Sequence, residues 1–318
     1  MFVQKVLLFL LVSGVPTGLL AQDSTPLNEA LRQPVVDKRL NMTIGVLGNS
    51  DGITFQAAHG FTNLAQERPA KVDTVVAIAS MTKLITTVAA LQLYEGGQLD
   101  IDAPVDTYLA ELAGLKKLTG FDNSGEPILV SPRRKPTVRE LMSHTSGFVY
   151  SIWNRNAKVA EEAGLTGDLL SGKEMIVNAP IAFEPGTHWE YGIGTDWLGV
   201  IVEEVSGLTL AEYFYKNIFD PLQMRDSFYE IPEDKIERVA YLLFRDNAHA
   251  FFRFLSLFSE GDLIEIPLMS AARATAKYSS SHYSGGGNLY STLPDYAKLL
   301  QCLLNLSLIH ISEPTRPL

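Results

Sequence analysis

The sequence predicts a globular α/β protein, and three observations lead to this prediction. Residues 40–47 and 53–61 have the composition of two strands, and the turn signal at residues 49–52 between them indicates a β-hairpin. Apolar residues then recur at helical spacing in several later segments. The 318 residues are 46% hydrophobic and 19% charged, which suits a sizeable core in one large domain or two closely packed ones.

The N-terminus has the parts of a secretory signal peptide at residues 1–21. Lys5 gives a short basic region, residues 6–12 are a purely apolar run, and small residues precede a cleavage site after Ala21. Because this run is too short to cross a bilayer, we expect secretion without a stable membrane anchor. A retained anchor helix is the alternative. A secreted chain with a single cysteine, Cys302, fits a bacterial periplasm.

A serine and a lysine three positions apart begin the first long helix. Residues 75–79 are apolar like a short strand, S-M-T-K follows at residues 80–83, and helical spacing then continues to Gly96. Residues three apart share one face of a helix, so Lys83 lies within reach of the Ser80 hydroxyl. This is the arrangement of a serine nucleophile with a lysine base. The alternative is a serine N-cap followed by a solvated lysine.

The middle of the chain starts with a segment that we expect on the surface. Residues 114–136 are polar and rich in glycine, proline and basic residues, so they predict an exposed loop. The basic cluster at residues 133–135 could steer an anion, but a solvated loop fits it better. Thr137 and Glu140 then form a capping box that begins a helix.

The second half of the chain is mostly helical. We expect a helix at residues 197–205, closed by Ser206 and Gly207, and another at about 210–218. The aromatic-rich residues 231–283 look irregular, and core packing explains their phenylalanines better than a ligand cleft does. The glycine run at residues 285–287 precedes a helix from Thr292 through Leu304. Since the run lacks the lysine of a P-loop, we expect close backbone packing there rather than phosphate binding.

Charge and composition exclude several classes of function. The net charge of −10 disfavours partners such as nucleic acid or an anionic membrane. The six histidines are scattered and one cysteine cannot form a metal cluster, so we expect no metal and no organic cofactor. Asp100 and Asp102 could bind a cation, but a helix-capping turn is the stronger interpretation.

Five blocks in sequence order resemble the serine β-lactamase and penicillin-binding-protein superfamily, above all class C β-lactamases and β-lactamase-fold carboxylesterases. The likeness covers about residues 40–305. It implies a β-lactamase/transpeptidase-like α/β (α+β) fold, with an antiparallel sheet flanked by helices and an inserted, mostly helical subdomain. The blocks are H-G-F (59–61), I-A-S-M-T-K (78–83), L-M-S-H-T-S-G (141–147), F-E-P-G leading to W-E-Y-G-I (183–193), and S-G-G-G-N-L-Y-S-T (284–292).

The resemblance assigns three catalytic residues. Ser80 corresponds to the acylated nucleophile, Lys83 to its partner base, and Tyr191 to the tyrosine of the family's second motif, Y-x-N. A tyrosine beside an ammonium group can take the serine proton and pass it to the leaving group. A packed aromatic residue is the alternative for this tyrosine. His144 and Ser146 also match the family, and we expect them to fix a loop through hydrogen bonds.

Two departures from the family pattern matter. The second motif ends in Ile193 instead of asparagine, which weakens a β-lactamase assignment and favours the esterase branch. No K-T-G, H-x-G or W-x-G motif follows Tyr290, and residues 307–318 fit no strand of the fold. We therefore expect residues 22–306 to be an incomplete domain that lacks its C-terminal strands, followed by a non-native tail. We expect the chain as written to be inactive and a longer parent protein to be active.

The function that the resemblance implies is that of a secreted serine hydrolase. Ser80 would form an acyl-enzyme with small carboxylic esters or, as second choices, with β-lactams or D-Ala-D-Ala peptides. The Ser80 N–H would supply half of an oxyanion hole. The alternative is a non-catalytic protein of the same fold that binds peptidoglycan or another ligand. Ile193 and the absent third motif are the observations that favour this alternative.

Overall fold

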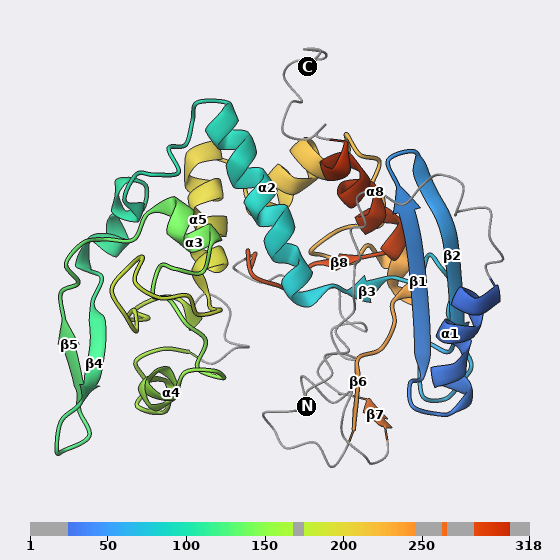
Figure 1. The fold of residues 1–318 in the computed structure, drawn as a ribbon, viewed down its shortest axis with the longest axis horizontal. Coiled ribbons are helices and arrows are strands. Elements are labelled where there is room, and N and C mark those ends of the chain that lie inside the picture. Colours follow the sequence, from blue (N-terminus) through green and yellow to red (C-terminus); the bar gives the residue numbers. More distant parts are fainter. Residues whose placement is uncertain (1–24, 168–174, 246–262, 266–282, 306–318) are drawn as a thin grey trace.

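The protein is seen in a computed structural model that describes residues 25–167, 175–245, 263–265 and 283–305 (Figure 1). The predicted signal peptide, the predicted tail and the phenylalanines at 251, 252, 254 and 258 lie outside these residues.

The predicted N-terminal hairpin is present. Strand β1 (Met42–Asn49) pairs antiparallel with β2 (Gly52–Gly60) around the predicted turn. Helices α1 (Thr25–Val36) and α8 (Leu293–Leu304) both pack against this hairpin, although they come from opposite ends of the chain (Figure 1). The sequence analysis did not predict α1, which contains Pro34 and buries no residue completely.

Helix α2 (Thr82–Glu95) runs through the middle of the molecule, with the hairpin and its two helices on one side and α3 and α5 on the other (Figure 1). A 3₁₀ turn at Ala79–Met81 precedes it, so Ser80 lies just before the α-helix rather than in it. Strand β3 (Val76–Ala77) is shorter than the predicted strand and pairs antiparallel with β8 (Tyr290–Ser291). This pairing brings the glycine run near residue 286 close to the start of α2.

Three further helices complete the central core. Helix α5 (Gly194–Ser206) ends at Gly207, whose φ of 69° is left-handed, as its predicted C-terminal position requires. Helix α3 (Val138–Met142) begins with the predicted capping box, and α6 (Leu210–Phe214) continues into a π-helical turn.

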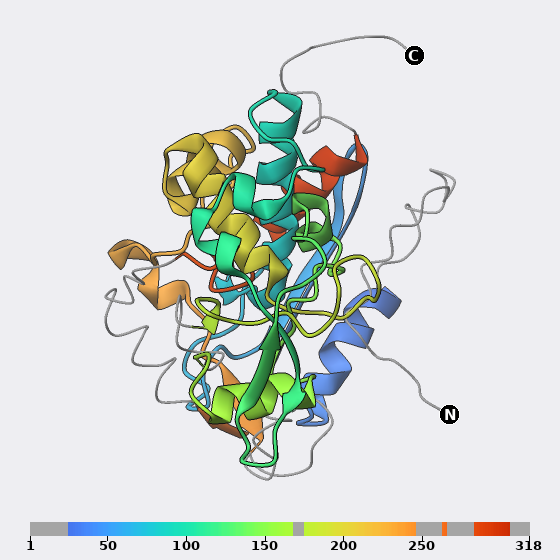
Figure 2. The same cartoon turned by 90° about the vertical axis from the view of Figure 1, so that its left-hand side faces the viewer.

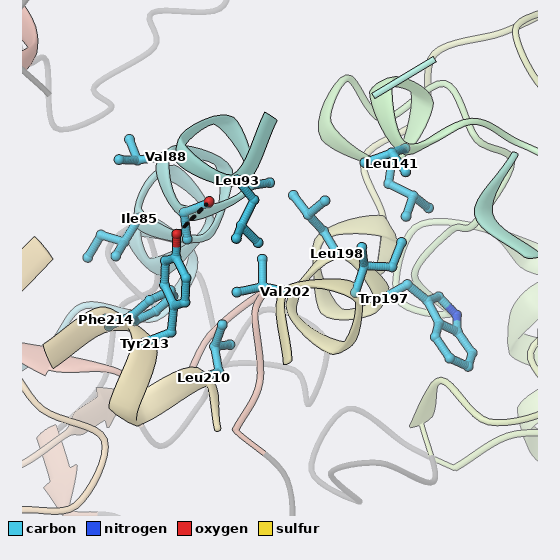
Figure 3. Close-up of a cluster of buried hydrophobic side chains, with 14 of the residues drawn as sticks. Ile85, Val88, Leu93, Leu141, Trp197, Leu198, Val202, Leu210, Tyr213 and Phe214 are labelled. Atoms are coloured by element: carbon cyan, nitrogen blue, oxygen red, sulfur yellow. Dashed lines mark hydrogen bonds between the residues drawn. The ribbon is translucent and has the colours of Figure 1, made fainter. Parts of the chain in front are cut away.

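The core lies where α2, α5 and α6 meet (Figure 3). Side chains of Ile85, Leu198 and Phe214 are completely buried there. The Tyr213 hydroxyl donates to the Ala89 carbonyl at 3.4 Å and so joins α6 to α2. Burying one apolar side chain such as Leu198 stabilises the fold by about 1.5–3 kcal/mol. The packing of these buried side chains therefore fixes α2 and α5 relative to each other.

Residues 114–136 lie mainly at the surface, as predicted, but they do not form a plain loop. Strands β4 (Lys117–Phe121) and β5 (Pro127–Val130) form an antiparallel hairpin, in which every strand residue except the buried Leu118 is at least partly exposed. The hairpin and α4 (Arg155–Glu162) lie near each other, away from the β1–β2 hairpin (Figures 1 and 2). A glycine and a proline in the strands hid their pattern, because both residues are typical of loops.

The aromatic-rich segment is only partly described. It contains a 3₁₀ turn at Glu233–Arg238 and a short antiparallel pair, β6 (Leu243–Arg245) with β7 (Leu263–Glu265).

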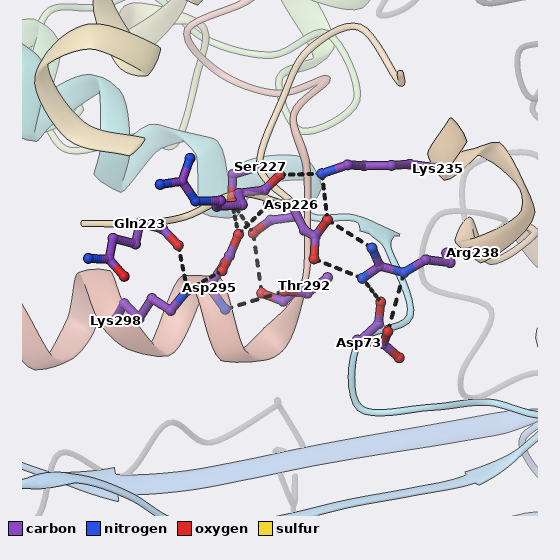
Figure 4. A network of polar contacts seen from close by, with 11 residues as sticks. Asp73, Gln223, Asp226, Ser227, Lys235, Arg238, Thr292, Asp295 and Lys298 are labelled. Carbon is purple, nitrogen blue, oxygen red and sulfur yellow. Dashed lines mark hydrogen bonds and ion pairs between the residues drawn. The ribbon is translucent and has the colours of Figure 1, made fainter. Parts of the chain in front are cut away.

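A polar network ties this 3₁₀ turn to the start of α8 (Figure 4). The Asp226 carboxylate accepts hydrogen bonds from Lys235 at 2.8 Å and from two nitrogens of Arg238. The Asp226 N–H donates to Asp295 in the first turn of α8 at 2.7 Å, and Lys298 pairs with Asp295. These contacts hold α8, and with it β8, in place.

The glycine run packs closely, as predicted. A Cβ on Gly285 would lie 2.2 Å from the Thr195 carbonyl oxygen and 3.1 Å from the Gly199 Cα, both in α5. Gly285→Ala is therefore expected to lower the free energy of unfolding by about 2–3 kcal/mol or more, because rigid backbone must move. Denaturant unfolding measures this loss. Gly114→Ala is the matched control, since nothing lies within 4 Å of a Cβ there, and a loss as large as in Gly285→Ala would contradict the packing argument.

Candidate active site

Ser80 and Lys83 lie side by side, as the sequence predicted. The Lys83 Nζ is 3.2 Å from the Ser80 Oγ. The lysine is only 8% exposed, whereas the serine is half-buried. Ala79, directly before the serine, has a left-handed φ of 44°. A residue with a side chain costs roughly 1–2 kcal/mol in this conformation, and such strain gathers at functional sites.

Tyr191 joins this pair. The Lys83 Nζ lies 4.9 Å from the centre of the Tyr191 ring, so the structure brings all three predicted residues together. Gly192 lets the segment that carries Tyr191 lie directly against the backbone of Phe148, because a Cβ on Gly192 would lie 2.1 Å from the Phe148 carbonyl oxygen. Tyr191 lies three residues before the start of α5 at Gly194, so the packing of α5 on α2 brings the phenol to the lysine.

A second tyrosine, Tyr150, also faces the lysine, and the sequence analysis missed it. Its ring centre is 5.5 Å from the Lys83 Nζ and 5.6 Å from the centre of the Tyr191 ring. Burial, and after it the charge of Asp196, raises the pKa of Tyr150 far above its usual range, so this phenol keeps its proton. The only sequence signal was its place three residues after Gly147, at the end of the third block.

The glycine run supplies the second contact of the lysine. The Lys83 Nζ donates to the Gly286 carbonyl oxygen at 2.7 Å. The neighbouring Gly285 carbonyl accepts from the Thr86 Oγ1 at 2.7 Å. The lysine is therefore held between the serine hydroxyl and a backbone carbonyl from a segment more than 200 residues away.

His144 and Ser146 contact the loops around the site. The Gly192 N–H donates to the His144 Nδ1 at 3.4 Å, and the Phe148 N–H donates to the Ser146 Oγ at 3.4 Å. The histidine ring lies 4.6 Å from the Tyr191 ring, centre to centre. Burial, and secondarily the charge of Lys83, lowers the pKa of His144 from 6.5 to about 4. The imidazole is thus neutral at pH 7 and accepts the backbone hydrogen bond.

The lowered pKa of His144 predicts that the protein becomes less stable as the solution is made acidic. Above pH 6.5 the ring is neutral in both the folded and the unfolded chain. As the pH falls from 6.5 towards 4, the unfolded chain binds the proton first, so the free energy of unfolding decreases until both states are protonated. We expect protonation of His144 to lower the free energy of unfolding by about 1–2 kcal/mol over this pH range. Solvent screens the exposed part of the ring, which keeps the effect this small.

Thermal unfolding at several pH values measures this effect. The control is His144→Asn, whose Oδ1 can still accept from Gly192 and whose side chain tolerates the left-handed backbone at this position, where φ is 58°. We expect the variant to lose less stability than the wild type between pH 6.5 and 4. Parallel curves would show that the ring does not titrate in this range.

Ile193 has an apolar role in the structure. It is 3% exposed and lines a small hollow with a volume of about 30 Å³. Leu118, Val149, Tyr150 and Met175 also line it. The third position of the second motif therefore contributes to an apolar wall beside the tyrosines, where the family's asparagine would offer a hydrogen bond.

The charged residues that the sequence singled out outside this site make local contacts. Asp102 pairs with Arg139, and Asp100 accepts from the Asp102 N–H, which fits the predicted turn. Arg134 makes a bidentate contact with Glu140, so this part of the basic cluster is not simply solvated. In the described ranges no three histidine, cysteine or acidic side chains gather in a metal-binding group. No helix in those ranges is long and apolar enough to cross a membrane.

Comparisons with known proteins agree with the resemblance in sequence. A family model described as Beta-lactamase matches residues 29–317. A lovastatin esterase from Penicillium rubens is 40% identical over 177 residues, which are 54% of this chain and 44% of the relative. A monacolin J acid methylbutanoyltransferase from Aspergillus terreus is 35% identical over 192 residues, 58% of this chain and 46% of that protein. The chain thus matches about half the length of these relatives.

A solved structure matches nearly the whole chain. A mutant form of simvastatin synthase from Aspergillus terreus superposes with a TM-score of 0.76 at 27% sequence identity. The match covers 93% of this chain and 72% of that one. The likeness therefore includes the hairpin and the helical part.

Proposed function

This chain belongs to the Beta-lactamase family, a family of serine hydrolases and acyltransferases, and from that premise we propose that the longer parent protein expected above, here called the full-length protein, hydrolyses small carboxylic esters through an acyl-enzyme at Ser80. The observation that carries the proposal is the contact of 3.2 Å between the Ser80 Oγ and the buried Lys83 Nζ, with the Tyr191 ring beside it. The lovastatin esterase among its relatives supports an ester substrate.

The reaction has two steps. The Ser80 Oγ attacks the ester carbonyl carbon, and its proton passes to the base formed by Lys83 and Tyr191. The tetrahedral intermediate expels the alkoxide, which takes up that proton and leaves as the alcohol. Water then attacks the acyl-enzyme, so the carboxylic acid leaves and the serine hydroxyl is restored. This chemistry requires no metal ion.

Ile193 supports esters over β-lactams and D-Ala-D-Ala peptides. An isoleucine side chain cannot donate a hydrogen bond to a lactam or peptide amide, whereas an apolar wall suits an acyl chain. We expect kcat/KM for p-nitrophenyl butyrate to exceed that for nitrocefin and for a D-Ala-D-Ala peptide by at least about 10²-fold. The full-length protein is the enzyme to assay. A nitrocefin rate equal to the ester rate would overturn the preference for esters.

Acyl transfer to an alcohol is the second candidate. The methylbutanoyltransferase among the relatives supports it, because an acyl-enzyme can react with an alcohol in place of water. Adding a hydrophobic alcohol to the ester assay distinguishes the two reactions. Release of p-nitrophenol together with a new ester would identify a transferase, and release with free acid alone would identify a hydrolase.

We also propose that the protein is exported to a bacterial periplasm, as the pattern at residues 1–21 indicates. Intact-mass measurement of the protein from the periplasmic fraction tests this. A mature chain that starts at Gln22 would support export, and a chain retained in the cytosol with Met1 in place would overturn it.

A further inference from the structure

Asp196 is a completely buried carboxylate that the proposed mechanism does not use. It lies in the first turn of α5 with an exposed fraction of 0%. No lysine or arginine among the described residues forms an ion pair with it. One oxygen, Oδ1, accepts hydrogen bonds from the Ser284 hydroxyl and from the Gly286 N–H, the latter at 3.0 Å. The other oxygen, Oδ2, has no hydrogen-bond partner among the described residues.

Such a carboxylate is costly, so its position calls for an explanation. Taking an ionised group out of water costs several kcal/mol unless hydrogen bonds and nearby charge compensate. The N-terminus of α5 stabilises negative charge, but an exposed acid would gain the same benefit without the cost of burial. The buried position of Asp196 differs from an exposed one in a single respect: it allows the carboxylate to contact the glycine run.

These contacts lead directly to the catalytic lysine. The peptide unit between Gly285 and Gly286 is held at both ends, because its carbonyl accepts from Thr86 in α2 and its N–H donates to Asp196 in α5. The next carbonyl along the chain, that of Gly286, then accepts from the Lys83 Nζ at 2.7 Å. Fixing this peptide unit therefore fixes the acceptor that orients the lysine towards Ser80.

Two further observations show how closely the carboxylate is built into this arrangement. A Cβ on Gly286 would lie 2.4 Å from the Asp196 Oδ2, so only glycine lets the backbone approach the acid this closely. The charge of Asp196 also contributes to the raised pKa of Tyr150, whose ring faces the same lysine. Its electric field thus reaches the site.

We propose that Asp196 is a positioning residue of the active site, which orients the Gly286 carbonyl so that Lys83 is held against Ser80. This inference rests on the proposed function, since it needs Lys83 to act on Ser80. The Oδ1 atom does the positioning, and an asparagine at this place would keep one oxygen acceptor for the Gly286 N–H.

Three variants of the full-length protein test the inference. Asp196→Ala removes the acceptor, Asp196→Asn keeps an oxygen there without the charge, and Thr195→Val is the matched control. Thr195 is the adjacent buried residue, 1% exposed, and its hydroxyl has no hydrogen-bond partner. The readouts are kcat and KM for p-nitrophenyl butyrate, with kcat expressed per active site titrated by a fluorophosphonate, and the melting temperature.

We expect Asp196→Ala to lower kcat per titrated site by about 10²-fold while KM changes by less than about threefold, because a small misplacement of a catalytic group has this effect. The kcat per titrated site of Asp196→Asn should be at least about tenfold higher than that of Asp196→Ala, and the value for Thr195→Val should equal that of the wild type. A lower melting temperature with unchanged kcat per site would indicate a merely structural role and overturn the inference. An asparagine variant as slow as the alanine variant would overturn positioning through Oδ1.

A second variant keeps the test decisive if Asp196→Ala does not fold. Thr86→Val has nearly the same shape and releases the other end of the same peptide unit. We expect it to lower kcat per site by about tenfold, whereas a value equal to that of Thr195→Val would overturn the inference. Failure of the proposed function looks different, because turnover would then survive the loss of Ser80 itself.

Discussion

Ser80→Ala is expected to lower kcat/KM for p-nitrophenyl butyrate by at least about 10⁴-fold in the full-length protein. The acyl-enzyme cannot form without the hydroxyl that lies 3.2 Å from the Lys83 Nζ. Because the serine is half-buried and its hydroxyl contacts only this lysine among the residues that the structure describes, the variant should fold normally. Steady-state hydrolysis and thermal unfolding measure the two effects.

Ser131→Ala is the control for this prediction. Ser131 is exposed, and its hydroxyl contacts only Lys116, at 3.3 Å, among the described residues. We expect its turnover to equal that of the wild type. Undiminished turnover in Ser80→Ala would show that another group, or water alone, attacks the ester.

Lys83→Met should lower the rate of ester hydrolysis by about 10³-fold or more, because the serine loses the group that takes its proton. Methionine has a similar length, so the core around α2 should still pack. The Gly286 carbonyl loses its donor, which costs about 1–3 kcal/mol, but the fold no longer has to bury the polar amine of the lysine. Activity should therefore fall far more than the melting temperature.

Two other substitutions separate the role of the base from that of charge alone. Lys158→Met is the control, since Lys158 is exposed on α4 and pairs with Glu161; we expect it to leave activity unchanged. Lys83→Arg keeps a positive charge, but a guanidinium does not give up its proton in proteins, so it should not restore turnover. An active arginine variant would contradict proton transfer to residue 83.

Much of the fold was predictable because its signals are local. The hairpin followed from the turn at residues 49–52, α3 from the capping box of Thr137, and the end of α5 from Gly207. The β-lactamase/transpeptidase-like fold class was also predicted correctly, from motifs in order. The approach of Ser80 and Lys83 was predicted from their helical spacing.

The residues that were missed depend on contacts between distant segments. Tyr150 reaches the lysine because α5 and the loop after α3 pack together, and nothing in its neighbouring sequence indicates this. Asp196 lies in the first turn of a helix. An acidic side chain at this place is usually solvated and is stabilised there by the helix dipole, so its sequence gives no sign that it is buried. Only the fold shows that the glycine run covers it. The β4–β5 hairpin was missed because its strands contain loop-forming residues.

The most direct test of the central claim is to locate the covalent adduct that a fluorophosphonate forms on the full-length protein. Peptide mass spectrometry after labelling identifies the modified residue. The account predicts a single phosphonylated serine at position 80, formed rapidly in the wild type, slowly in Lys83→Met, and not at all in Ser80→Ala. An unlabelled Ser80 in folded protein, or equal labelling of another serine, would contradict the acyl-enzyme and favour a non-catalytic ligand-binding protein of the same fold.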